Sequence, residues 1–131
     1  MTTQDSGLPG MEVADDLRHP MWTKPEPGLP DIIYRLHKHM WADLQRFDGR
    51  QDMSEVLIFA QEVHDLSKTA TDGTAYTLLI GQILLKAEVA KRMVRTMGEL
   101  RGERWREYSK RDEKVLTALA HNWVQVIVSN I

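Results

Sequence analysis

The sequence predicts an all-α protein, a four-helix antiparallel bundle preceded by a Pro/Gly-rich N-terminal arm. Three observations predict this fold. Apolar residues recur at helical spacing in four separate segments after residue 31. Short connections separate these segments, and short connections favour antiparallel neighbours. All five prolines lie within residues 1–30, where each removes a backbone donor that a helix would need.

Composition indicates one domain. Residues 1–30 are expected to form an extended arm, and residues 31–131 a single helical bundle domain. A chain of 131 residues is long enough to bury roughly two thirds of its unfolded surface in one core. The absence of cysteine excludes disulfides and thiolate metal sites. Because the N-terminus lacks a basic start and an apolar run, and no apolar stretch approaches the ~20 residues of a membrane span, we expect a cytoplasmic protein.

The first two helices follow the arm directly. The first is predicted over about 32–47, because Asp31 can cap it. Asp52 and Glu55 have the spacing of a capping box, which predicts the start of a second helix that ends near Lys68. The apolar positions are Ile32, Ile33, Leu36, Met40, Leu44 and Phe47 in the first, and Val56, Leu57, Phe59, Ala60, Val63 and Leu66 in the second.

A turn over residues 69–74 precedes a third and longer helix, predicted over about 75–97. Gly98 is a suitable stop signal for it. Gly81 lies inside this helix at a cost on the order of 1 kcal/mol relative to alanine, which suggests that another backbone approaches closely there. The predicted apolar face is broad and consists of Leu78, Leu79, Gln82, Ile83, Leu85, Val89, Ala90, Met93, Val94 and Met97.

The last helix is predicted over about 110–128. Residues 99–108 form a polar, glycine-containing connection or a short helix before it. Ser109 and Asp112 resemble a capping box at its start. Its apolar positions are Val115, Leu116, Leu119, Trp123, Val126 and Ile127.

Positive charge is concentrated in residues 86–114. This stretch contains ten of the seventeen Lys and Arg residues of a chain whose net charge is −2, so a polyanion or an acidic protein is the expected ligand. Trp105 and Tyr108 are interleaved with the basic residues and are candidates for base stacking. The predicted nucleic-acid-binding residues are Lys86, Lys91, Arg92, Arg95, Arg101, Arg104, Lys110 and Lys114.

Six acidic residues share the same stretch, so an alternative remains open in which the charges form solvated ion pairs along the helices. A domain that binds nucleic acid by itself normally has a pI above about 9. The pI of this chain is about 6.2. We therefore expect it to contribute one charged wall to a larger assembly.

A catalytic alternative rests on the consecutive pair His64 and Asp65, with His37 and His39 upstream and Lys68 downstream. This arrangement resembles the metal-dependent phosphohydrolase family named for its His-Asp pair. The resemblance implies that His37 or His39, with the pair, would hold metal ions that activate water. No other nucleophile, phosphate loop or cofactor motif is present, so the main expectation is a non-catalytic protein without cofactor or metal.

The size, the helical architecture and the charge placement over residues 31–131 resemble the small helical subunit of multi-subunit CRISPR effector complexes. The resemblance implies an antiviral ribonucleoprotein complex in which several copies lie side by side on larger subunits. It also implies contacts with the backbone of RNA or single-stranded DNA, and an arm that tethers neighbours. A protein-interaction module, such as a phage inhibitor or an immunity protein, is the alternative.

Overall fold

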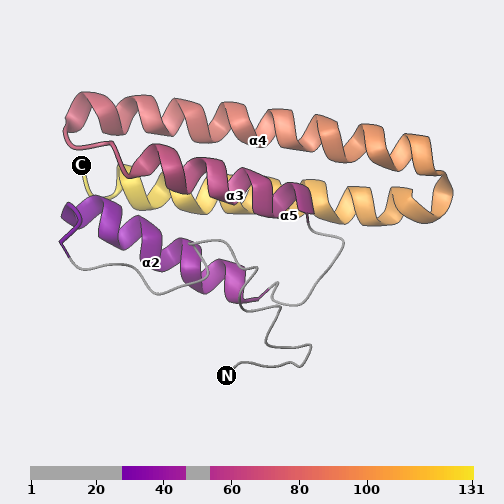
Figure 1. Ribbon diagram of the computed structural model, residues 1–131, viewed down its shortest axis with the longest axis horizontal. Coiled ribbons are helices and arrows are strands. Elements are labelled where there is room, and N and C mark those ends of the chain that lie inside the picture. The colour runs from indigo at the N-terminus through magenta and orange to yellow at the C-terminus, as the bar shows by residue number, and fades with distance from the viewer. Residues whose placement is uncertain (1–27, 47–53) are drawn as a thin grey trace, which may run out of the picture.

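The computed structural model describes residues 28–46 and 54–131. These residues form four helices, namely α2 (Asp31–Gln45), α3 (Ser54–Ser67), α4 (Gly73–Arg101) and α5 (Glu103–Val128), and contain no strand (Figure 1). The prediction of an all-α fold with four helices is confirmed for this part of the chain. Most of the predicted N-terminal arm, residues 1–27, lies outside the described residues.

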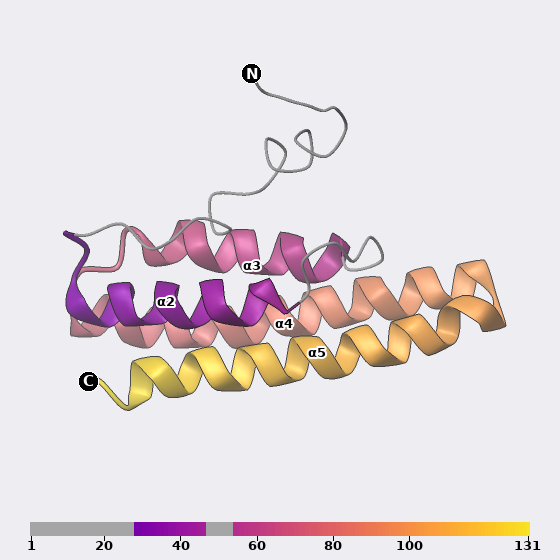
Figure 2. The ribbon, with the colours of Figure 1, turned by 90° about the horizontal axis from the view of Figure 1, so that it is seen from below.

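The four helices surround one core, and successive helices run in opposite directions (Figure 1). α4 and α2 lie at opposite edges in Figure 1, and the perpendicular view places α3 and α5 on opposite sides of α2 (Figure 2). α4 and α5 have 29 and 26 residues, whereas α2 and α3 have 15 and 14. The α4–α5 hairpin therefore projects beyond the two shorter helices.

The core lies between the four helices and is mostly aliphatic. Trp123 of α5 is fully buried, and its ring stacks on Phe59 of α3 with 5.6 Å between ring centroids. The predicted core positions Leu79, Ile83 and Leu119 are all buried. The largest completely buried side chains are Trp123, Phe59, Ile33, Leu36, Met40, Leu44, Ile83, Leu116, Ile127, Val56 and Val63.

Two buried polar contacts connect the helices. Trp123 Nε1 donates to Asp43 Oδ2 of α2 at 2.8 Å, which satisfies an indole N–H that burial would otherwise leave without a partner. His37 of α2 lies 2.6 Å from Ser67 of α3, measured from Nε2 to Oγ. Since Ser67 Oγ donates to the carbonyl oxygen of His64, His37 Nε2 carries the proton and donates to Ser67.

The helix starts differ from those predicted. Pro30, not Asp31, is the N-cap of α2, because Asp31 already lies in the first turn, where it pairs with Arg35 at 2.9 Å. Asp72 caps α4 by accepting from the backbone N–H of Ala75 at 2.9 Å. The predicted capping box of the second helix includes Asp52, which lies outside the described residues.

The predicted stop at Gly98 is wrong. α4 continues through Gly98 to Arg101, and the chain reverses at Gly102, whose φ of +95° favours glycine. Gly98 is instead a contact point between helices, since a Cβ atom there would lie 2.7 Å from Ser109 Cβ. Ser109 does not begin α5. It is a buried residue whose hydroxyl donates to the Val94 carbonyl oxygen at 3.0 Å.

Gly98→Ala is expected to lower the free energy of unfolding by about 1–2 kcal/mol, because the overlap with Ser109 outweighs the gain of about 1 kcal/mol in helix propensity. Urea denaturation measures the change. Gly73→Ala is the control, since a Cβ at Gly73 has no heavy atom within 4 Å. Ser109→Gly should cost less in the Gly98→Ala background than in the wild type, and unchanged stability of Gly98→Ala would contradict the close contact.

The apolar face predicted for the third helix combines two different surfaces. Leu79, Ile83 and Val94 are buried. Leu78, Leu85, Val89, Met93 and Met97 are exposed, and so is Leu100 beyond the predicted end. Among residues 28–46 and 54–131, no helix combines the length and the apolar character that a bilayer-crossing segment requires.

Candidate nucleic-acid interface

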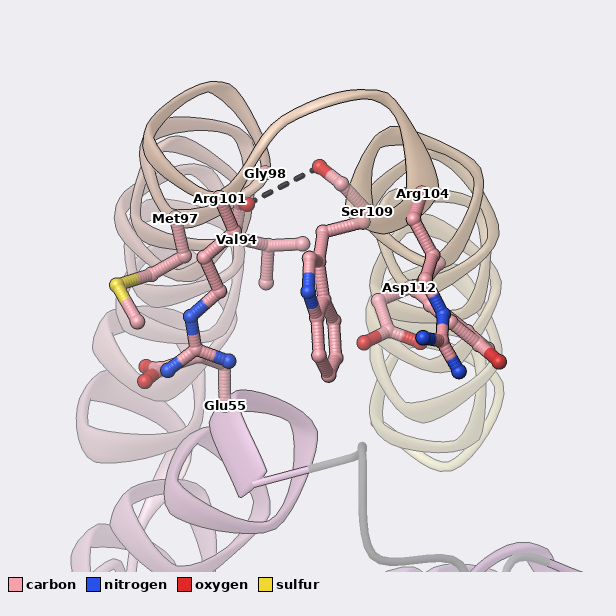
Figure 3. A pocket seen from close by; sticks show the side chains of 10 residues that line it. Glu55, Val94, Met97, Gly98, Arg101, Arg104, Ser109 and Asp112 are labelled. Atoms are coloured by element: carbon pink, nitrogen blue, oxygen red, sulfur yellow. Dashed lines mark hydrogen bonds between the residues drawn. The ribbon is translucent and has the colours of Figure 1, made fainter.

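The α4–α5 hairpin carries a cavity of about 610 Å³ that four of the predicted functional residues line, namely Arg101, Arg104, Trp105 and Tyr108. Arg101 comes from the last turn of α4 and the other three from the first turns of α5. Figure 3 shows the Arg101 and Arg104 side chains extending in the same direction, one from each helix, on the two sides of the cavity. The cavity thus joins two guanidinium groups with two aromatic rings.

The reversal at Gly102 produces this arrangement. Its backbone N–H donates to the Gly98 carbonyl oxygen at 3.1 Å, and its own carbonyl oxygen accepts from Trp105 and Arg106 at 3.0 and 3.2 Å. Because a single residue separates the helices, the end of α4 and the start of α5 are adjacent. The Arg101 guanidinium carbon consequently lies 5.0 Å from the centroid of the Trp105 ring, within the range of a cation–π contact.

The aromatic rings are held by their neighbours. Trp105 and Tyr108 meet at a tilt of 47°, with 5.4 Å between ring centroids. The guanidinium carbon of Arg111 lies 4.9 Å from the centroid of the Tyr108 ring on the other side. Trp105 and Tyr108 are both partly buried, so each ring keeps some surface for a ligand.

Two carboxylates also line the cavity, Glu55 from α3 and Asp112 from α5. Asp112 is buried and lies 3.5 Å from Arg111 Nε, which neutralises it. Glu55 therefore offsets one of the two guanidinium charges of Arg101 and Arg104. The sequence pattern did not indicate that these two carboxylates line the cavity, because Asp112 resembled part of a helix cap and Glu55 lies far away in the chain.

The remaining six predicted nucleic-acid-binding residues lie outside this cavity, and four of them are in ion pairs. The pairs are Lys86 with Glu62 at 3.9 Å, Lys91 with Glu88 at 2.6 Å, Arg95 with Glu113 at 2.6 Å and Lys110 with Glu107 at 3.8 Å. Contact with Glu113 raises the pKa of Arg95 above its ordinary value. Arg92 and Lys114 are exposed.

The His-Asp region has a different geometry from the one that the phosphohydrolase resemblance implies. His37 and His64 are buried and stack with 4.2 Å between ring centroids. Asp65 is exposed and accepts a hydrogen bond from Gln61 at 2.8 Å, and His39 is exposed on α2. Within residues 28–46 and 54–131, no three His, Asp or Glu side chains gather closely enough to hold a metal ion.

The environment of His37 favours its neutral form. Burial, and then the nearby charges of His64 and Lys68, lower its pKa from 6.5 to about 4. The imidazole is therefore uncharged at neutral pH, in agreement with its donation to Ser67. His37 and His64 together form a polar part of the core between α2 and α3.

A larger cavity of about 1010 Å³ lies between α2 and α5. Arg35 and Lys38 line it, but Asp31 at its rim is already paired with Arg35. Asp43 on its floor accepts from Trp123, so its carboxylate is engaged in the core. None of the predicted nucleic-acid-binding or stacking residues lines this cavity, whereas His39, a candidate ligand in the phosphohydrolase resemblance, does.

The sequence matches no protein-family model and no curated protein, and no solved structure matches the fold.

Proposed function

We propose that this protein is a non-catalytic helical subunit of a nucleoprotein assembly, and that it holds the backbone of RNA or single-stranded DNA at the end of the α4–α5 hairpin. One observation carries the proposal. Arg101, Arg104, Trp105 and Tyr108 line a single cavity, which combines cations for a phosphate with rings on which a base can stack.

The charge distribution favours a subunit over a protein that binds nucleic acid alone. The pI is about 6.2, and acidic residues pair with four of the predicted basic residues that lie outside the cavity. Few unpaired cations in the described residues then remain to neutralise phosphates, so the isolated chain binds weakly, with a shallow salt dependence that reflects the small number of phosphate contacts. In the narrower form that the architectural resemblance suggests, the assembly is a cytoplasmic CRISPR effector complex, and base pairing supplies the sequence specificity.

The charge-reversal variant Arg101→Glu/Arg104→Glu tests this proposal. Fluorescence anisotropy with a short single-stranded RNA and the corresponding DNA, measured over a salt series, reports the affinity. We expect the variant to weaken binding at low salt by at least tenfold and to reduce the salt slope by about two, one for each lost phosphate contact. Trp105→Ala should weaken binding by roughly 5- to 150-fold, the cost of one lost base stack.

Arg92→Glu/Lys114→Glu is the matched control. It changes the net charge by the same amount, at exposed positions that do not line the cavity. Equal losses in the two double variants would indicate binding to diffuse surface charge and would contradict the cavity. Absence of wild-type binding at low salt would contradict the function itself.

A protein-interaction module with an acidic partner is the second candidate. The ion pairs of Lys86, Lys91, Arg95 and Lys110 favour it, because they leave Arg101 and Arg104 as a local cation pair rather than part of a long positive surface. If the wild type binds neither RNA nor DNA, a pull-down from cells tests this candidate, with the wild type and Arg101→Glu/Arg104→Glu as the two baits. Capture of one acidic protein by the wild type alone would support it.

A further inference from the structure

Several apolar side chains of α4 are exposed to solvent. Figures 1 and 2 show that the other described helices leave the outer side of α4 uncovered. We define an apolar stripe as Leu78, Leu85, Val89, Met93 and Leu100, all of which are exposed. Its two end residues, Leu78 and Leu100, are 66% and 78% exposed. Single exposed apolar residues are ordinary, but five along one side of a 29-residue helix indicate an interaction surface.

The stripe remains on one side of the helix because of its repeat. Leu78, Val89 and Leu100 recur every eleven residues, which corresponds to about 3.67 residues per turn, close to the period of a straight α-helix. Leu85 and Met93 lie four residues before and four residues after Val89. The stripe therefore reads nearly the same in both directions from its centre.

We propose that this stripe is the interface of a homodimer in which two copies of α4 pack antiparallel around a two-fold axis at Val89. In an isologous contact, if residue i of one copy contacts residue j of the other, then residue j of the first copy contacts residue i of the second. Leu78 then packs against Leu100 of the second copy, Leu85 packs against Met93, and Val89 packs against itself. The stripe residues lie at equal distances before and after Val89, so one antiparallel arrangement forms all of these pairs at once. A parallel arrangement would not need this symmetric spacing.

The exposed apolar area suits a second copy of the chain. Ile58 and Leu66 of α3 are also exposed, and the ion pair between Glu62, which lies between them, and Lys86 places this side of α3 beside α4. Together with the stripe they make seven exposed apolar side chains on adjoining sides of α3 and α4. A second copy packed on this face would cover them, as the apolar core of a standard interface of ~800 Å² per partner is covered.

The residues between the apolar positions are compatible with this pairing. Gln82 and Thr96 lie seven residues before and after Val89, so the pairing places each opposite the other across the interface, where an amide and a hydroxyl can hydrogen-bond. Arg92 of one copy lies within a turn of Glu88 of the other. Gly81 is exposed, and a Cβ there would meet nothing within 4 Å in the single chain, so it leaves room for a second backbone.

Cysteine cross-linking tests the axis, because the natural chain has no cysteine. Oxidised Val89→Cys should form a disulfide-linked dimer, since the two-fold axis brings the two residues together. Leu78→Cys alone should remain unlinked, because the cysteines at position 78 of the two copies lie about 33 Å apart along the helix axis. It should cross-link when mixed with Leu100→Cys, because the pairing places these two positions opposite each other. Ala118→Cys, exposed on α5, is the control that should not cross-link.

Sedimentation equilibrium of the full chain gives the independent measurement. The wild type should be a dimer at micromolar concentration. Val89→Glu should be a monomer with unchanged helical content, because it places two like charges on the axis, whereas Leu84→Glu, at an exposed position outside the stripe, should remain a dimer. A monomeric wild type would overturn the proposal, and the N-terminal segment or another protein would then be the partner that covers the stripe. Self-linking of Leu78→Cys would also overturn it, because it contradicts an axis at Val89. None of these positions lines the cavity at the hairpin end, so nucleic-acid binding can fail or succeed independently.

Discussion

Replacement of Ile83 by aspartate is expected to unfold the protein at room temperature. Ile83 is 1% exposed in the middle of α4, at the centre of the core. A carboxylate there loses its hydration without gaining a partner, and the core also loses the isoleucine contacts. These combined effects exceed about 4–5 kcal/mol, a large part of the 5–15 kcal/mol that stabilises a typical domain. Circular dichroism should show loss of most helical signal.

Leu84→Asp is the matched control for this variant. Leu84 is adjacent in sequence and identical in helix context, but it is 49% exposed. The same substitution there should leave the protein folded with a change within about 1 kcal/mol. Folded Ile83→Asp with a normal melting curve would show that the α4 face assigned to the core is wrong.

The protein is also expected to lose stability on mild acidification because of His37. The unfolded chain binds a proton on this residue below about pH 6.5, but the folded protein does not until about pH 4. The contribution of neutral His37 is therefore fully present above pH 6.5. It decreases as the pH falls toward 4, by a total on the order of 3 kcal/mol. Urea denaturation at several pH values between 7 and 4 measures this decrease.

His37→Gln separates this effect from the titration of carboxylates in the same pH range. The glutamine amide can still donate to Ser67 but does not titrate, so the variant should show a flatter dependence of stability on pH. Equal slopes in the wild type and His37→Gln would mean that folding does not lower the pKa of His37, and would contradict the effect of burial.

Helical periodicity located the four segments because each helix buries one apolar face. It failed at Gly98 because a glycine that ends a helix and a glycine that allows two helices to touch look identical in sequence. Only the contact with Ser109 distinguishes them. For the same reason Ser109 resembled a cap, although its hydroxyl bonds to Val94 from within a buried turn.

The candidate site was only partly predictable. Arg101, Arg104, Trp105 and Tyr108 are close in sequence, so a local pattern was enough to single them out. Ion pairs such as Arg95 with Glu113 join residues 18 positions apart, and they depend on how the two helices pack. The stripe on α4 appeared to belong to the core because both faces of that helix are apolar, and hydropathy does not reveal which face has a neighbour.

The single-residue reversal at Gly102 has a dynamic consequence. No side chain between Gly98 and Ser109 is buried, so the end of the hairpin is attached to the domain mainly through these two residues. Segments with few buried contacts open locally with much less free energy than the global unfolding requires. The backbone amides of residues 99–108 should consequently exchange with solvent faster than those of the central turns of α4. A ligand in the cavity would slow their exchange, so amide protection at the hairpin end provides a direct record of occupancy.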